Sequence, residues 1–119
     1  MFDSAGMMDR LMGDHELAGI VVDGFLEDAP RLIDALRSSL VAGDAAGAIR
    51  GAHTIRGASA TVGGEALRAV AWELEKAGTA GDFEAVAAGL PELEAELGRL
   101  REAMARFADE MRRQPEGPG

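Results

Sequence analysis

The chain contains no cysteine and no tyrosine, and aromatic side chains make up only 4% of its 119 residues. Without cysteine, the protein has no disulfide framework, no thiol catalysis and no zinc site built from cysteine ligands. With so few aromatic rings, its core must consist of Leu, Val, Ile, Met and Ala, a composition that favours helices over strands. At this length a single domain buries enough apolar surface to fold without metal ions or disulfides. We therefore expect one all-α core.

Three further absences concern location and binding. No apolar run approaches the ~18 residues of a membrane helix, and the N-terminus, Met1 to Ser4, lacks the basic residues and apolar run of a secretory signal. The formal net charge is −9 and no basic run exceeds two residues, so nucleic acid and anionic membranes would be repelled. Glycine-rich nucleotide-binding motifs are absent. We expect a cytoplasmic protein that binds no nucleic acid, no membrane and no ATP.

Glycine and aspartate residues divide the chain into helical segments. Each of the pairs at 13–14, 43–44 and 81–82 reads Gly-Asp, a helix stop followed by an N-cap, and Gly63-Gly64 forms a further break. Between these breaks, apolar residues recur at helical spacing. The pattern predicts a short helix within residues 3–12 and longer helices over 17–40, 45–62, 65–78 and 86–111. Asp3 or Ser4 is expected to cap the first of them.

Four longer helices joined by turns of a few residues must run antiparallel to their neighbours. The predicted fold is therefore all-α: an up-down antiparallel four-helix bundle with a short extra N-terminal helix. Residues 1–113 would form this single domain, and 114–119, rich in Pro and Gly, a flexible C-terminal tail. Because the apolar seam of the last helix is needed to close the core, we expect a monomer. Pro30 should bend its helix, and Pro91 should kink the last helix or split off its first turns.

A histidine stands out in the middle of the chain. Within the helix predicted over 45–62, the apolar residues form one inward face, and His53 points away from it. Arg56 and Gly57 follow at i+3 and i+4, which a helix places beside the imidazole. Because glycine in a helix costs roughly 0.5–1 kcal/mol relative to alanine, Gly57 is expected to serve access to the ring. This helix and the turn after it contain two arginines, Arg50 and Arg56, and no acid, although the whole chain is acidic.

This stretch resembles the histidine-containing phosphotransfer (HPt) domain family. The likeness rests on residues 52–59 and on Val62-Gly63, which match the family pattern A-H-x-[LI]-K-G-[SA]-[SA]-x-x-[LIV]-G, and it extends to 25–30 and 90–94. The resemblance implies an all-α four-helix bundle that passes phosphoryl groups between receiver domains. Arginine stands at position 56 where the family usually has lysine, which keeps the charge but replaces a compact ammonium with a planar fork.

By this resemblance His53 is the phosphoryl acceptor, Arg56 the cation near the phosphate, and Gly57 the small residue that lets a receiver domain dock. The chemistry of the imidazole agrees, because its neutral form has a free lone pair and can attack a phosphoryl group without a separate general base. Phosphorylation adds about two negative charges, which Arg56 can partly neutralise. An acid beside His53 would repel both the phosphate and the acidic pocket of a receiver, so we expect acid-free surroundings.

The resemblance also implies the partners: response-regulator receiver domains and a sensor or hybrid histidine kinase. Since nothing in the sequence binds ATP, the phosphoryl group must come from a partner, and the Mg²⁺ and aspartate that drive transfer belong to that partner. We therefore expect a phosphotransfer protein that is not itself an enzyme and holds no cofactor and no metal. Ile49, Arg50 and Ala60, with the exposed edge of the second helix, are expected to form the docking surface.

Two other functions stay open from the sequence alone. The domain could be the phosphoacceptor module of a chemotaxis-type histidine kinase, labelled directly by an ATP-binding domain, or a scaffolding or inhibitory bundle whose histidine is idle. Trp72, the only tryptophan, falls off the apolar stripe of its helix, and packing against a neighbouring element is favoured over contact with a partner. His15 is expected to be solvated, since two histidines alone do not make a metal site.

Overall fold

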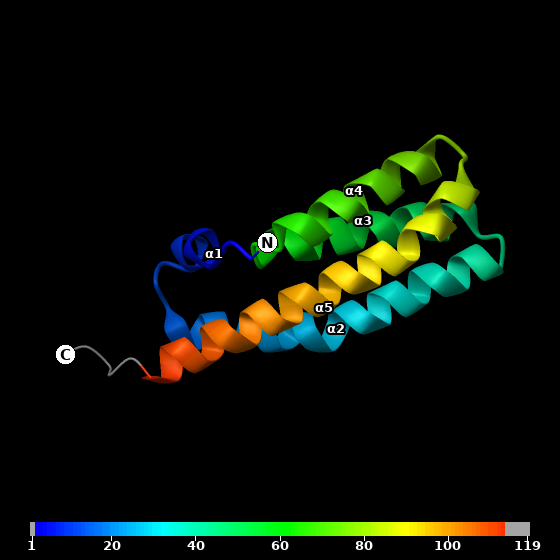
Figure 1. The fold of residues 1–119 in the computed structure, drawn as a ribbon. Coiled ribbons are helices and arrows are strands. Elements are labelled where there is room, and N and C mark those ends of the chain that lie inside the picture. Colours follow the sequence, from blue (N-terminus) through cyan, green and yellow to red (C-terminus); the bar gives the residue numbers. More distant parts are fainter. Residues whose placement is uncertain (1, 114–119) are drawn as a thin grey trace.

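The computed structural model describes residues 2–113, except for the side chain of Arg112. Within this range the chain forms five helices and no strand, which confirms the all-α prediction (Figure 1). The helices are α1 (Ser4–Arg10), α2 (His15–Val41), α3 (Ala45–Thr61), α4 (Glu65–Thr79) and α5 (Phe83–Arg113). The tail predicted over 114–119 lies outside the described residues. Of the helices in the described range, none combines the length and hydrophobicity that a transmembrane crossing requires.

Aspartate side chains begin four of the five described helices. A carboxylate oxygen at each start accepts a hydrogen bond from the backbone N–H three residues on, and this satisfies a donor that the helix itself leaves free. The distances are 2.9 Å for Asp3, 3.0 Å for Asp14, 2.9 Å for Asp44 and 3.1 Å for Asp82. A glycine with positive φ precedes each of the last three caps. The predicted stop-and-cap pairs are therefore confirmed.

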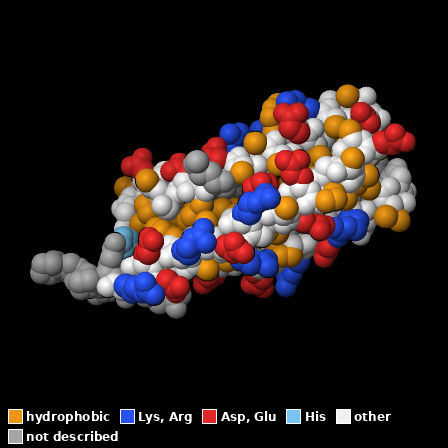
Figure 2. Space-filling model, in the orientation of Figure 1, with side chains coloured by type: hydrophobic (Ala, Val, Ile, Leu, Met, Phe, Trp, Pro, Cys, Tyr) orange, Lys and Arg blue, Asp and Glu red, His pale blue; other side chains and the backbone are white. Residues whose placement is uncertain are grey.

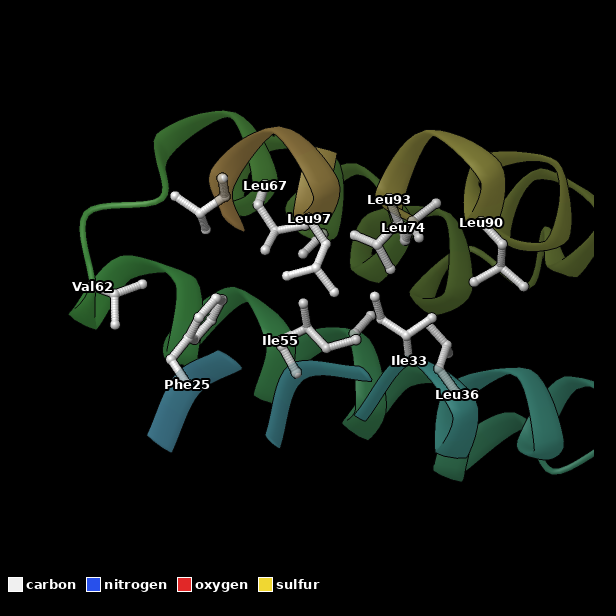
Figure 3. Packing of buried hydrophobic residues seen from close by; sticks show 14 of the residues in the cluster. Phe25, Ile33, Leu36, Ile55, Val62, Leu67, Leu74, Leu90, Leu93 and Leu97 are labelled. Carbon is white, nitrogen blue, oxygen red and sulfur yellow. The ribbon is translucent and has the colours of Figure 1, made fainter. Parts of the chain in front are cut away.

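The four long helices pack side by side around one core. α3 packs against α2 and α4, and α5 packs against α4 and α2, so each long helix contacts two others (Figure 1). Figure 3 shows apolar side chains from all four helices pointing toward one another. Leu36 of α2, Ile55 of α3, Leu67 of α4 and Leu93 of α5 are almost completely buried. Figure 2 shows the surface of one face of the molecule, where charged side chains lie along the helices and hydrophobic side chains are visible between them.

Pro30 and Pro91 lie inside uninterrupted helices. α2 continues through Pro30 and α5 continues through Pro91. The interpretation that Pro91 splits off the first turns of the last helix is wrong, because Val86 and Leu90 before it and Leu93 after it are all buried in the same core. Burial on both sides outweighs the loss of one backbone hydrogen bond. The expected bends at the two prolines stay predictions.

The N-terminal segment holds the turn between α3 and α4. The Asp3 N–H donates to the carbonyl of Gly63 at 2.7 Å. The Phe2 ring meets the Phe107 ring of α5 edge to face, with centroids 5.5 Å apart. Arg10 of α1 donates to the carbonyls of the last two residues of α3, at 3.1 and 3.3 Å. Residues 2–10 therefore connect α5 to the α3–α4 turn and to the last carbonyl groups of α3.

Candidate functional site

The inner face of α3 fixes the direction in which His53 points. Ala52 and Ile55 are buried at 1% and 2% exposure, and Ser59 is fully buried with its hydroxyl donating to the Ile55 carbonyl at 2.6 Å. With these residues in the core, the helical phase places His53 on the outside. Its side chain is 62% exposed. The imidazole is therefore accessible to another protein, as the sequence predicts.

Two charged side chains contact the same nitrogen of this imidazole. Nδ1 of His53 lies 3.0 Å from Oε2 of Glu75 and 3.0 Å from Nη2 of Arg56. Nε of Arg56 donates to Oε1 of Glu75 at 2.7 Å. The three side chains form a closed triangle, in which Glu75 belongs to α4 and the other two to α3. The other ring nitrogen, Nε2, takes no part in it.

The protonation state of Glu75 decides how this triangle works. Its side chain is only 15% exposed, and burial by itself raises the pKa of a carboxyl group. Hydrogen bonds from Arg56 and His53, together with their positive charge, outweigh burial and lower the pKa of Glu75 below its ordinary value of 4.5. Glu75 is therefore a carboxylate near neutral pH, and a carboxylate only accepts hydrogen bonds.

An ionised Glu75 selects one tautomer of the neutral imidazole. A lone pair on Nδ1 would face the carboxylate at 3.0 Å and be repelled, whereas a hydrogen on Nδ1 completes a charge-assisted hydrogen bond. We therefore assign the hydrogen of His53 to Nδ1. The lone pair then resides on Nε2, which is the nucleophilic atom. In this tautomer Nη2 of Arg56 is a neighbour of Nδ1 and not its donor.

Arg56 also lies against an aromatic ring. Its guanidinium carbon is 4.7 Å from the centre of the Trp72 ring, and Nζ of Lys76 is 5.3 Å from the same ring. Both distances fall within the range of a cation–π contact. Trp72 is 39% exposed. The indole thus packs against a side chain of the neighbouring helix α3, as favoured from the sequence, and keeps one part of its surface open.

Gly57 is exposed, and the fold does not require a glycine there. A methyl group added at this position would meet no atom within 4 Å beyond the backbone of its own helix and its neighbours in the chain. Gly47 and Gly89 differ, because an added methyl group there would come within 2.3 Å of Asp44 or Leu74. The missing side chain at position 57 therefore leaves space on the outside of α3, one turn from His53.

The three residues expected to bind a partner differ in exposure. Arg50 is exposed, one turn before His53 on α3. Ile49 is half-buried, and its Cγ1 lies 3.0 Å from where a methyl group on Gly78 of α4 would stand. Ala60 is half-buried, and its carbonyl accepts the hydrogen bond from α1. Arg50 is thus the one of the three residues that is exposed.

A groove runs between α2 and α3. Its volume is about 530 Å³, and its wall combines apolar residues of α2 with small residues of α3. The residues that line it include Val21, Phe25, Leu32, Thr54 and Ala58. Thr54, which follows His53 directly in the sequence, is part of the wall of the groove. This is the exposed edge of the second helix that the sequence points to.

The expectation that no acid lies beside His53 is wrong. It was based on the absence of Asp and Glu from residues 45–64. However, α4 packs against α3 and brings Glu75 into contact with the ring. The repulsion expected from such an acid is offset by Arg56, whose guanidinium pairs with the same carboxylate at 2.7 Å. The local pair of charges is therefore neutral, and the carboxylate serves as an acceptor for Nδ1.

The sequence does contain a signal for Glu75. In an antiparallel helical hairpin, residues at equal distances from the turn face each other. His53 and Glu75 each lie eleven residues from Gly64, and Arg56 and Trp72 each lie eight residues from it. The position of the Gly63-Gly64 break therefore places the members of each pair at the same level of the hairpin, and the packing of α3 on α4 brings their side chains into contact. Among residues 2–113, no three His, Cys, Asp or Glu side chains are grouped so that they could hold a metal ion.

Comparison with protein families gives one match. A family model described as the Hpt domain matches residues 21–103. This span contains α3 and α4 completely, most of α2 and two thirds of α5, and leaves α1 outside. It includes all four side chains of the site just described. Comparisons with curated proteins and with solved structures returned no match.

Proposed function

The chain belongs to the Hpt domain family, whose members transfer phosphoryl groups on a histidine in two-component signalling, and on this premise we propose that His53 is the phosphoryl acceptor of a phosphorelay intermediate. The observation that carries the proposal is an imidazole that is 62% exposed and held at Nδ1 by a carboxylate. Because the hydrogen is on Nδ1, the exposed ring offers the lone pair of Nε2 to a partner.

The transfer step needs no general base in this protein. The Nε2 lone pair attacks the phosphorus of an aspartyl phosphate, the N–P bond forms, and the P–O bond to the aspartate breaks and leaves its carboxylate. The ring keeps its Nδ1 hydrogen and becomes positively charged, which strengthens the hydrogen bond to Glu75. Donation to the next receiver is the reverse of this step. The Mg²⁺ ion would be bound by the receiver.

Arg56 has two roles in this proposal. Its Nε–H donates to Oε1 of Glu75 at 2.7 Å, and this hydrogen bond keeps the carboxylate oriented toward Nδ1 of His53. Its Nη2 lies 3.0 Å from the imidazole, so the same cation is close enough to offset part of the charge that a phosphoryl group brings. The planar fork of arginine allows both contacts at once, which the compact ammonium of lysine would not.

The proposed docking surface extends from His53 to the groove between α2 and α3. Gly57 leaves room for close approach, and Arg50 offers a positive charge to the acidic pocket of a receiver. The apolar wall of the groove suits an apolar helix face of the partner. Ile49 and Ala60 would lie at the margins of this surface, since both are half-buried.

The partners we propose are a sensor or hybrid histidine kinase and receiver domains, since Hpt domains interact with both in phosphorelays. The phosphoryl group would come from a receiver aspartate or a hybrid kinase and pass to a response regulator. The proposal includes a single monomeric domain over 1–113 and the antiparallel up-down order of the four long helices. The short turns between these helices support that order.

Incubation with a phosphorylated receiver domain tests the proposal. The wild-type chain should acquire an acid-labile, base-stable label, and His53→Gln should acquire none. His15→Gln is the matched control, because it removes the other exposed histidine and should be labelled like wild type. Labelling of His53→Gln would contradict the assignment. Labelling by a kinase domain and ATP with no receiver present would instead support the chemotaxis-type phosphoacceptor.

A further inference from the structure

Trp72 is a large apolar side chain that the core does not use. It is 39% exposed, whereas Ala71 and Leu74 beside it on α4 are buried at 0% and 4%. It is not among the residues that form the hydrophobic core or pack against it. An aromatic ring in this position needs another reason to be there, because a polar residue would suit an exposed helix face better.

The contacts of the indole are with cations. The Arg56 guanidinium lies over the ring at 4.7 Å and the Lys76 ammonium at 5.3 Å. Lys76 also pairs with Glu73 at 2.7 Å on the exposed side of α4. Arg56 is the more enclosed of the two, with 32% of its side chain exposed against 47% for Lys76. The indole therefore covers the guanidinium from one side.

Two neighbouring side chains on one turn of α4 contact Arg56. Trp72 and Glu75 are three residues apart, so a helix places them next to each other. Glu75 binds Arg56 at the edge of the guanidinium, through Nε, and the guanidinium carbon lies over the Trp72 ring. A single hydrogen bond lets a planar group rotate about it, while a second contact with a bulky ring restricts that rotation. A long side chain with ~2 kcal/mol of rotamer entropy thereby keeps one position.

We propose that Trp72 is a positioning residue for phosphotransfer, which acts by holding Arg56 in the orientation that keeps Glu75 on Nδ1 of His53. The inference rests on the proposed function, because it concerns the rate of the same transfer. The contacts of the Trp72 ring with charged groups are those with Arg56 and Lys76. Its effect reaches Nε2 through Arg56 and Glu75, so its loss should disturb the tautomer and the guanidinium before it disturbs the fold.

The test compares Trp72→Phe with Trp72→Leu in the full chain. Phenylalanine keeps an aromatic face, while leucine keeps apolar bulk without one. Nuclear magnetic resonance gives two signals. The Arg56 Nε–H signal is visible when the hydrogen bond to Glu75 protects this hydrogen from exchange with water. The chemical shifts of the His53 ring nitrogens report which tautomer is present. Trp72→Phe should keep both signals. Trp72→Leu should broaden the Arg56 signal and shift the ring nitrogens toward a mixture of tautomers.

Transfer rates from a phosphorylated receiver provide the second measurement. Trp72→Leu should slow transfer by about threefold to tenfold, as expected for loss of one cation–π contact, and Trp72→Phe by less than about twofold. Because Trp72 acts through Arg56, the double variant of Trp72→Leu with Arg56→Ala should be no slower than Arg56→Ala alone. Lys76→Ala is the control for the second cation and should transfer like wild type.

Two results would overturn the inference. An Arg56 signal that is unchanged in Trp72→Leu would show that the indole does not hold the guanidinium. The second is a double variant whose transfer rate falls below that of Arg56→Ala by the same factor by which Trp72→Leu falls below wild type. That result would show that the ring acts by touching the partner. Failure of the proposed function is distinguishable, since a wild-type chain that takes no label still gives the resonance measurements.

Discussion

Gly57 lowers the stability of α3, and packing within the protein does not require a glycine at this position. Glycine in a helix interior costs roughly 0.5–1 kcal/mol relative to alanine. A methyl group at this position would meet no other atom within 4 Å beyond its own helix and chain neighbours. The reason for the glycine is therefore to be sought outside the chain, in whatever approaches the neighbouring His53.

Gly57→Ala should separate stability from function. The variant should be more stable by about 0.5–1 kcal/mol in urea unfolding, because alanine is the better helix former. Transfer from a phosphorylated receiver should slow by about tenfold or more, because the methyl group stands where the partner approaches the ring. The measurement is the rate of labelling at a fixed receiver concentration.

Gly98 of α5 provides the matched control for Gly57. It is also exposed within a helix, and an added methyl group would likewise meet nothing within 4 Å. Gly98→Ala should give the same gain in stability and leave transfer unchanged. If Gly57→Ala transferred as fast as Gly98→Ala, the position would have no role in docking.

At the scale of the elements, the α3–α4 hairpin depends on the N-terminal segment. The turn contains Gly63 with φ +73°, and its carbonyl accepts the hydrogen bond from Asp3. The segment passes so close that a methyl group on Gly63 would lie 2.4 Å from the Asp3 carbonyl oxygen. Both the backbone conformation and the space therefore require glycine here. Because the hairpin pairs His53 with Glu75, the N-terminal segment supports the site through the turn.

Gly63→Ala should destabilise the protein more than Gly81→Ala does. Both glycines have positive φ, +73° and +80°, and alanine in that region costs about 1–2 kcal/mol. An added methyl group has a clash only at position 63, since nothing lies within 4 Å of position 81. Gly63→Ala should therefore lose about 1–3 kcal/mol more in urea unfolding. Equal losses would mean that the N-terminal segment moves aside at little cost.

At the scale of the whole molecule, the site is one ion cluster in a chain with a net charge of −9. The charges of Arg56 and Glu75 cancel locally, and Arg50 adds a positive charge beside the histidine. The cluster joins α3 to α4, so the free energy of its hydrogen bonds is part of the stability of the entire fold. Since Glu75 titrates with a lowered pKa, that stability must depend on pH.

The free energy of unfolding should show this dependence when wild type is compared with Glu75→Gln. Because the folded-state pKa of Glu75 lies below its ordinary value of 4.5, the unfolded chain binds the proton first as the pH falls. The contribution of the carboxylate is thus fully present above the unfolded-state pKa, and it is lost as the pH falls through the folded-state pKa. Wild type should be more stable than the variant at pH ~7, and the difference should shrink in acid.

Urea unfolding from pH ~7 to pH ~3 measures this difference. Glu102→Gln, which removes an exposed carboxylate from α5, is the control and should leave the pH profile of wild type nearly unchanged. A constant difference between wild type and Glu75→Gln across this range would show that the carboxylate is not held by Arg56 and His53 in the folded state.

The features that could be predicted from the sequence are those that arise within a single helix. Helical periodicity placed His53 outside and Ile55 inside, and Gly-Asp pairs marked where helices begin and end. These properties arise from contacts three or four residues apart along the chain, which the order of residues specifies directly. Of the two alternatives for Pro91, the split of the helix is wrong because it considered the backbone preference of one residue without the burial on either side of it.

The amino-acid sequence alone determined five helices, their caps and an exposed histidine with arginine and glycine beside it, because each of these is a local property of the backbone and its nearest neighbours. Tertiary structure alone decided that Glu75 binds Nδ1, that Trp72 covers Arg56 and that Ile49 is half-buried against Gly78. Contacts between helices depend on how α3 and α4 pack, and packing is set by the whole core. The ring nitrogen of His53 that keeps the lone pair is therefore selected by a residue from another helix.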